Sequence, residues 1–325
     1  MPTGNGAYVL HRQLEANLSG YSVRGYSPWW TLAPFTLPWF GRGGRVDLIH
    51  THLDYGCCFK RVGIPLVATV HNYVLDAFMA PYSSFLQRLH YRTDLRWFIS
   101  RTLEVADCVT AVSRFLAAKV RRDLGSTREI KVIYNGVDEQ RFQPAVSAAR
   151  EKGPFRILFS GNLSRRKKAD AIIPLAKALG GGFEIHYTAG LAGTELPAGD
   201  AGQGKVVALG KVPYSKMPEL YHAADALFMP SVREGFGLSV AEAMACGLPV
   251  VANDCSAIPE LVEDGAGGFL CEIGRIDQYA EAFRRLADAP RLRRDMGAFN
   301  RARVEERFTL SRMVAEYRSL FESMR

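Results

Sequence analysis

The stretch of residues 231–251, SVREGFGLSVAEAMACGLPVV, constrains the fold more than any other part of the chain. The apolar run just before it, residues 226–229, has the length of a buried strand. The glycines of the Glu-Gly-Phe-Gly loop let the backbone approach a ligand closely. The Ala-rich segment from Ser239 predicts a helix that ends before Pro249, after which a strand resumes. A strand, a glycine loop, a helix and a further strand are typical of an α/β protein.

The start of this predicted helix is a candidate anion-binding site. The first N–H groups of a helix have no partner within it, and the helix dipole adds positive charge there. A phosphate can therefore be held without a metal ion. Two carboxylates bracket the site, Glu234 in the loop and Glu242 in the helix. Glu242 also fits a capping box with Ser239, which would be purely structural, whereas Glu234 has no comparable structural explanation.

The same stretch resembles the paired-glutamate signature of family 4 glycosyltransferases, retaining enzymes of the GT-B fold. The resemblance implies an α/β protein whose two Rossmann-like domains face each other across a cleft. It also implies that Glu234 accepts hydrogen bonds from the donor sugar and that Glu242 holds the ribose. The residues of this stretch that we expect to bind the donor are Glu234, Gly235, Phe236, Gly237, Leu238, Ser239 and Glu242.

The length of 325 residues suits two α/β domains. With the resemblance, it predicts an N-terminal acceptor-side domain over residues 1–143 and a linker over residues 144–153. A donor-nucleotide-binding domain follows over residues 154–305. A final helix, residues 306–325, is expected to cross back onto the N-terminal domain.

The composition favours a cytoplasmic protein. No apolar run reaches the length of a membrane span, and the first residues lack the pattern of a secretion signal. The six cysteines have no metal-ligand spacing, which predicts free thiols in a reducing compartment.

The net charge of +8 is concentrated in the first half of the chain, because residues 1–143 hold 17 Lys and Arg against 11 Asp and Glu. This excess suggests an anionic partner: a membrane surface, an anionic acceptor or nucleic acid. No nucleic-acid-binding motif is present, so we expect no nucleic acid. In the predicted helix over residues 84–105, Arg88, Arg92 and Arg96 recur at four-residue spacing on one face. They form either a solvated face or a site for an anionic membrane.

Residues 28–41 contain three prolines and five aromatic residues, a composition that excludes a regular helix or a central strand. The segment is either a loop packed by its own rings or a patch that contacts a membrane interface or acceptor sugar through Trp29, Trp30 and Trp39.

Near the N-terminus, Gly4, Asn5 and Gly6 form a glycine turn that opens a predicted helix. The resemblance implies that this turn faces the donor phosphates, although the strand that precedes it in the family is absent. Two predicted strands, residues 46–52 and 65–72, end in polar residues that include three histidines, and ligands bind at such strand ends. His71 matches the family's histidine beside the donor sugar and is the preferred site histidine.

The predicted second domain begins with a strand, a glycine turn and a cluster of cations, residues 155–168. By resemblance, Gly161 and Lys167 take the places of the family's phosphate-binding glycine and lysine. Asn162 replaces an arginine, a loss for which Arg165 or Arg166 would compensate. The turn that contains Gly210 and Val212 is expected to meet the nucleobase.

We therefore expect a hexosyltransferase that moves a sugar from a UDP- or GDP-sugar to a glycan or lipid-linked acceptor. No two aspartates stand two residues apart, so the Asp-x-Asp pair that often holds Mg²⁺ is absent, and we expect neither metal nor cofactor. The expected catalytic residues are Glu234, His71 and Lys167. The alternatives are a non-catalytic nucleotide-sugar-binding protein of the same fold and, less well supported, an epimerase of sugar nucleotides.

Overall fold

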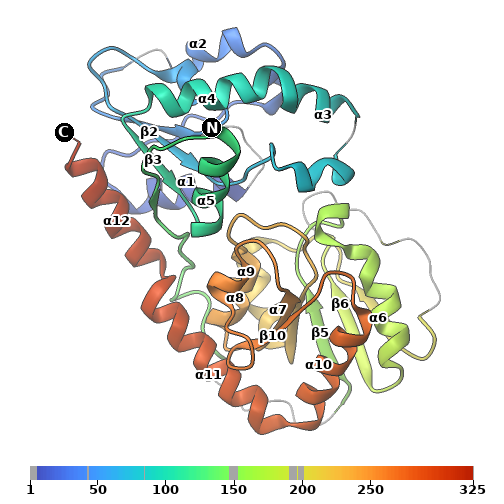
Figure 1. Cartoon of the computed structure of the whole chain (residues 1–325). Coiled ribbons are helices and arrows are strands. Elements are labelled where there is room, and N and C mark those ends of the chain that lie inside the picture. The colour runs from blue at the N-terminus through green and yellow to red at the C-terminus, as the bar shows by residue number, and fades with distance from the viewer. Residues whose placement is uncertain are drawn as a thin grey trace. The chain divides into compact units, whose positions relative to one another are not determined.

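The computed structural model describes residues 6–41, 44–83, 85–145, 153–189, 196 and 201–324. It divides the chain into two compact units, each built on its own parallel sheet (Figure 1). Unit 1 contains Met1–Gly136 and Ser311–Arg325, and unit 2 contains Val137–Leu310. Residues 137–143, predicted to close the first domain, thus belong to unit 2. Most of the predicted linker lies outside the described residues.

Unit 1 contains a four-stranded parallel sheet in the order β1-β2-β3-β4. Its strands are β1 (Ile49–His52), β2 (Leu66–Val70), β3 (Cys108–Ala111) and β4 (Lys131–Val132). Its helices are α1 (Gly6–Asn17), α2 (Leu37–Gly41), α3 (Phe85–His90), α4 (Arg96–Val105), α5 (Arg114–Leu124) and the larger part of α12 (Leu310–Glu322).

Local sequence explains these elements. All five residues of β2, LVATV, are buried, as expected for an inner strand of a parallel sheet covered on both faces. Ser113 caps α5 by accepting a hydrogen bond from the Leu116 amide at 3.2 Å. Gly125 ends that helix with a left-handed φ of 60°. The strand, cap and stop signals of this region are confirmed.

The aromatic segment differs from its prediction. It forms two 3₁₀ turns, Pro28–Leu32 and Pro34–Thr36, followed by the five-residue helix α2. The exclusion of any regular helix was therefore wrong. Pro38 lies in the first turn of α2, where a missing N–H removes no intrahelical hydrogen bond.

The predicted helix over residues 84–105 is interrupted. It consists of α3, a π-helical turn over Tyr91–Leu95, and α4. Arg88, Arg92 and Arg96, which we call the arginine row, are nevertheless all exposed.

Unit 2 contains a six-stranded parallel sheet in the order β10-β9-β8-β5-β6-β7. Its strands are β5 (Phe155–Phe159), β6 (Phe183–Tyr187), β7 (Lys205–Ala208), β8 (Ala226–Met229), β9 (Val250–Asn253) and β10 (Gly268–Cys271). Its helices are α6 (Ile172–Leu179), α7 (Met217–His222), α8 (Leu238–Ala245), α9 (Ile258–Leu261), α10 (Ile276–Asp288) and α11 (Pro290–Arg307). The first strand of the unit, β5, lies in the middle of the sheet. Its carboxyl end therefore meets the ends of both β6 and β8.

The core of unit 2 lies between the sheet and helices α6 and α10. Phe228 of β8 makes edge contacts with the rings of Tyr279 and Phe283 on α10. The chain returns to unit 1 through α12, whose Tyr317 hydroxyl lies 3.4 Å from Oγ1 of Thr69 in β2. The last helix thus packs on the first unit's sheet.

Candidate active site

The candidate donor site of unit 2 lies at the carboxyl ends of β5 and β8. The chain leaves β5 through Ser160 and Gly161 and forms a 3₁₀ turn, Arg165–Lys167. Ser164 caps this turn by accepting a hydrogen bond from the Lys167 amide. The Val232 amide, just after β8, donates to the Arg166 carbonyl at 3.0 Å. That bond holds the cationic turn against the loop that carries Glu234.

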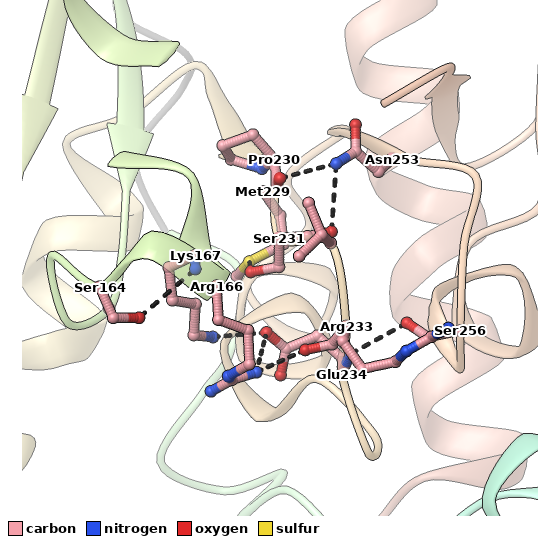
Figure 2. A network of polar contacts seen from close by, with 12 residues as sticks. Ser164, Arg166, Lys167, Met229, Pro230, Ser231, Arg233, Glu234, Asn253 and Ser256 are labelled. Atoms are coloured by element: carbon pink, nitrogen blue, oxygen red, sulfur yellow. Dashed lines mark hydrogen bonds and ion pairs between the residues drawn. The ribbon is translucent and has the colours of Figure 1, made fainter. Parts of the chain in front are cut away.

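Lys167, Arg166 and Glu234 meet in one ionic cluster (Figure 2). Oε1 of Glu234 lies 2.8 Å from Nζ of Lys167 and 3.1 Å from Nη1 of Arg166. Arg166 also donates to the Arg233 carbonyl. The Glu234 carboxylate is 9% exposed and the Lys167 side chain 13%, so the pair is largely withdrawn from water. Sequence reasoning placed all three residues at the donor, and the structure brings them together.

The charge state of Glu234 follows from these partners. Burial raises the pKa of its carboxyl, but the positive charges of Lys167 and Arg166 outweigh burial and lower the pKa to about 2. Glu234 is therefore ionised at neutral pH. An anion already lies where the sequence predicted that cations would receive a diphosphate.

Ser256 is a site residue that sequence reasoning did not identify. Its hydroxyl accepts a hydrogen bond from the Glu234 amide at 3.0 Å. Its φ of 55° is left-handed, a conformation that glycine adopts at less cost.

Glu242 does not form the capping box considered above. Helix α8 begins one residue earlier than expected, with Gly237 as its N-cap at a φ of 105°, so Ser239 lies inside the helix. Oε2 of Glu242 instead accepts a hydrogen bond at 2.8 Å from the hydroxyl of Tyr221, a fully buried residue of α7. The Tyr221 hydroxyl also lies 3.4 Å from Oγ of Ser160, at the end of β5. Tyr221 thus joins α8 to the end of the central strand, a role that sequence reasoning missed.

Burial dominates the ionisation of Glu242. It raises the pKa of the carboxyl to about 7, although hydrogen bonds from Tyr221 and Tyr214 and the charge of Lys167 act in the opposite direction. Burial also raises the pKa of Tyr221 well above its usual range, with the nearby Glu242 carboxylate as a further cause. The two glutamates of the signature therefore have opposite pKa shifts.

The start of α8 supplies backbone N–H groups. The Val240 amide donates to the Gly237 carbonyl, so the amides of Leu238 and Ser239 precede the first hydrogen bond of the helix. Leu238 and Ser239 are both partly exposed. Phe236, predicted to bind the donor, has a buried side chain that packs edge-on against Phe308. Its assignment to the donor stays a prediction.

The other predicted donor residues of unit 2 lie at the same edge of the sheet. Gly161 has a φ of 154°, and its amide donates to Oγ1 of Thr188 at 3.0 Å. Asn162 is exposed and follows it. Gly210 follows β7, with its carbonyl accepting from the Ala189 amide at 2.8 Å, and Val212 is partly exposed. Gly210 and Val212 are separated from β5 by β6.

Unit 1 contains the remaining predicted residues. Gly4 and Asn5 lie outside the described residues, and Gly6 begins α1. His71 follows β2 and lies within a cluster of four imidazole rings, which we call the histidine cluster and define as His11, His50, His52 and His71. The Nε2 atoms of His71 and His11 are 3.2 Å apart.

In the part of the chain that the structure describes, no group of three or more His, Cys, Asp or Glu side chains is arranged to hold a metal ion. All six cysteines are free, as predicted. Among the described helices, none combines the length and apolar character needed to cross a membrane.

Comparison with known proteins identifies the family. The model of "Glycosyl transferases group 1" matches residues 140–303, and the model of "Glycosyltransferase Family 4" matches residues 8–141. The chain belongs to the family 4 glycosyltransferases. The resemblance found in the paired-glutamate stretch is therefore confirmed for nearly the whole chain.

Two relatives and one solved structure are similar to this chain in sequence or in fold. The enzyme is 25% identical to N-acetyl-alpha-D-glucosaminyl L-malate synthase of Bacillus anthracis, over 94% of this chain and 82% of the relative. It is 27% identical to D-inositol 3-phosphate glycosyltransferase of Streptomyces griseus, over 80% of this chain but only 64% of that protein. The structure of Anabaena HepE in complex with UDP and glucose covers 99% of this chain with a TM-score of 0.76 and 18% identity, and is itself covered to 97%. The GT-B fold expected from the sequence is confirmed.

Proposed function

We propose that this glycosyltransferase moves a sugar from a UDP- or GDP-sugar to a glycan or lipid-linked acceptor, with retention of anomeric configuration and without a metal ion. The observation that carries the proposal is the ionic cluster of Lys167, Arg166 and Glu234 beside the start of α8. Solved complexes of HepE with UDP and with UDP-glucose support a nucleotide-diphosphate donor. The names of the two relatives contain L-malate and D-inositol 3-phosphate, and we infer that small hydroxyl compounds of this kind are acceptors in the family.

The cluster explains how a diphosphate would be neutralised. A lysine ammonium has three N–H donors and an arginine guanidinium has five, so each cation can hold Glu234 and a phosphate oxygen together. The amides of Leu238 and Ser239 would add two neutral donors. Charge that develops on the leaving diphosphate would thus meet preorganised donors in a site largely withdrawn from water. No step of this account needs a metal ion.

Retention of configuration would follow from attack on the face of the leaving group. The departing diphosphate can itself accept the acceptor proton, so no dedicated base is required. We assign Glu234 to the donor sugar hydroxyls, Glu242 to the ribose and His71 to the neighbourhood of the transferred sugar. The turn containing Gly210 and Val212 would meet the nucleobase.

The test is transfer by purified enzyme with UDP- and GDP-sugars, in EDTA and in Mg²⁺, with the anomeric configuration of the product read by NMR. We expect an α-linked product from an α-linked donor at equal rates in both buffers. Glu234→Ala should reduce the rate on the order of 100-fold or more. An inverted product, or loss of activity in EDTA, would contradict the proposal. Binding of UDP without turnover on any acceptor would instead favour the non-catalytic alternative.

We further propose that unit 1 associates with an anionic membrane on the cytoplasmic side. Phe85, Leu89 and Trp97 are exposed apolar residues on α3 and α4, and they alternate with the exposed Arg88, Arg92 and Arg96. Among the described contacts, neither Arg88 nor Arg92 has an acidic partner. Helical segments with this mixture of exposed arginines and large apolar side chains are typical of the membrane interface.

The aromatic segment extends this surface. Trp29, Phe35 and Trp39 are exposed to 78%, 79% and 63%. Helix α2 and helix α4, which begins at Arg96, both contact the 3₁₀ helix Gly56–Phe59. Trp30 is less exposed and packs against Phe40 with ring centroids 5.2 Å apart. Trp29 and Trp39 are thus more exposed than Trp30, and contact of this segment with a membrane or an acceptor stays a proposal.

The membrane proposal is tested by sedimentation with phosphatidylcholine vesicles, with and without phosphatidylglycerol. Because each arginine near an anionic surface contributes about 1 kcal/mol, Arg88→Ser with Arg92→Ser should weaken binding to the anionic vesicles about 30-fold. The matched control is Arg121→Ser with Arg122→Ser, two exposed arginines of α5. Equal binding of both double variants, or equal binding of the wild type to neutral vesicles, would contradict the proposal.

A further inference from the structure

The histidine cluster of unit 1 is held in a continuous chain of hydrogen bonds. Nε2 of His71 lies 3.2 Å from Nε2 of His11, and Nδ1 of His11 lies 2.6 Å from the Tyr21 hydroxyl. The same hydroxyl lies 2.9 Å from Nδ1 of His50. Nε2 of His50 lies 2.6 Å from Oγ1 of Thr69, which continues into the buried sheet. The chain joins α1, the loop after it, β1 and the segment after β2.

The rings of this chain are neutral at neutral pH. Burial, followed by repulsion from neighbouring histidines, lowers the pKa of His11 and of His71 well below the usual range and lowers that of His50 to about 3. A neutral imidazole has one N–H donor and one acceptor nitrogen. Each bond in the chain therefore needs a donor on one side and an acceptor on the other.

If the Tyr21 hydroxyl donates one of its two bonds and accepts the other, two arrangements satisfy every bond from His71 to Thr69. In the first, His71 donates from Nε2 to His11, His11 donates from Nδ1 to Tyr21, Tyr21 donates to His50, and His50 donates to Thr69. In the second, every donor and acceptor is exchanged. The first leaves Nδ1 of His71 as an acceptor, and the second makes it a donor. The chain thus couples the tautomer of His71 to groups that lie away from it.

We propose that His11 and Tyr21 are positioning residues that fix the orientation and the tautomer of His71. The inference rests on the proposed function, which assigns His71 to the neighbourhood of the transferred sugar. His11 contacts His71 directly and Tyr21 acts through His11. Tyr21 is itself held by stacking on Phe321 of α12, at a ring-centroid distance of 5.9 Å and an interplanar angle of 14°.

The test combines NMR with kinetics on the whole enzyme. Tyr21→Phe keeps the stacked ring but removes the hydroxyl that joins His11 to His50. In protein labelled with ¹⁵N-histidine, the wild-type His71 ring should show a single tautomer, and Tyr21→Phe should shift its Nδ1 and Nε2 resonances toward a mixture. We expect kcat to fall about tenfold with the KM for the donor unchanged, because orientation of one group is lost while donor contacts remain.

A matched control is available in the same unit. The Tyr55 hydroxyl lies 3.1 Å from Nε2 of His90, outside the chain, so Tyr55→Phe removes a comparable bond and should leave the His71 resonances unchanged. If Tyr21→Phe does not fold, His11→Gln should give the same shift and the same fall in kcat. Unchanged His71 resonances in a folded Tyr21→Phe or His11→Gln variant would overturn the inference. Shifted resonances together with full activity of His71→Ala would support the positioning chain and overturn the proposed role of His71.

Discussion

The ammonium of Lys167 lies 2.8 Å from Oε1 of Glu234, although the two residues come from loops that follow different strands, β5 and β8. These strands are neighbours in the sheet of unit 2. The pair therefore depends on strand order and not on proximity in the sequence.

Lys167→Met should weaken donor binding. It removes one charge-assisted donor and leaves Arg166 as the remaining cation beside the Glu234 carboxylate, so the Kd for UDP should rise about 10- to 100-fold. Titration calorimetry measures the change. The matched control is Lys168→Met, because Nζ of Lys168 lies 2.8 Å from the exposed Asp170 and not from Glu234. Equal effects of the two substitutions would contradict the assignment.

Gly161→Ala should weaken UDP binding as well as lower the free energy of unfolding. The φ of 154° disfavours any residue with a Cβ atom, and that atom would lie 3.5 Å from Cε of Lys167. Gly180→Ala serves as the comparison, since Gly180 ends α6 at a φ of 75° and a Cβ atom there would meet nothing within 4 Å. Both variants should lose roughly 1 kcal/mol of unfolding free energy. Only Gly161→Ala should also weaken UDP binding, and unaltered UDP affinity in that variant would show that Gly161 does not shape the phosphate site.

The stability of the enzyme should depend on pH through Glu242. Its folded-state pKa of about 7 lies above the ordinary value of 4.5, so folding favours the protonated carboxyl. This contribution is fully present below pH 4.5 and is lost as pH rises to about 7. The shift corresponds to roughly 3 kcal/mol as an order of magnitude.

Urea denaturation of the wild type and of Glu242→Gln between pH 4.5 and pH 8 isolates this effect. The difference in unfolding free energy between the two proteins should change across this window, because the amide does not titrate. A constant difference would show that Glu242 has an ordinary pKa. Glu234 affects the free energy of unfolding in a different pH range. Its contribution is fully present above pH 4.5 and is lost as pH falls toward 2, because its folded-state pKa is lowered.

Tyr221→Phe should destabilise unit 2. It removes the 2.8 Å hydrogen bond to the buried Glu242 carboxyl and the weaker contact with Ser160, at a cost of about 1–3 kcal/mol. Tyr214→Phe is the natural comparison, because Tyr214 also bonds Glu242 but is 39% exposed, so water can replace its hydroxyl. Denaturant midpoints should therefore fall more for Tyr221→Phe, and the reverse order would contradict a structural role for Tyr221.

Several elements could be read from the chain because their signals are local. The strand, glycine loop and helix around Glu234 follow from an apolar run, two glycines and an Ala-rich segment, and they correspond to β8 and α8. The cap at Ser113 and the stop at Gly125 are equally local. By contrast, the π-helical turn between α3 and α4 has no sequence signal of comparable strength.

The contacts that could not be predicted from the sequence involve side chains whose environment is set by distant residues. The ring of Phe236, within the signature, packs against Phe308, which lies far along the chain. Glu242 has a plausible capping partner three residues away, yet its hydrogen bond comes from Tyr221 on another helix. Spacing along a chain cannot identify a partner that only the packing of α7 against α8 supplies.

The family, the α/β class and the charged residues of the candidate donor site could be predicted from the chain, because glycine loops, buried strands and paired glutamates are local patterns. How those residues pair depends on the three-dimensional packing. Because β5 and β8 are adjacent in one sheet, two cations lie beside Glu234. Burial and these cations give the two glutamates different pKa values. The packing of α1 and α12 on the first sheet brings His11, Tyr21 and His71 together. The physical reason is that burial and electrostatic interaction depend on distance in space, which strand order and helix packing determine.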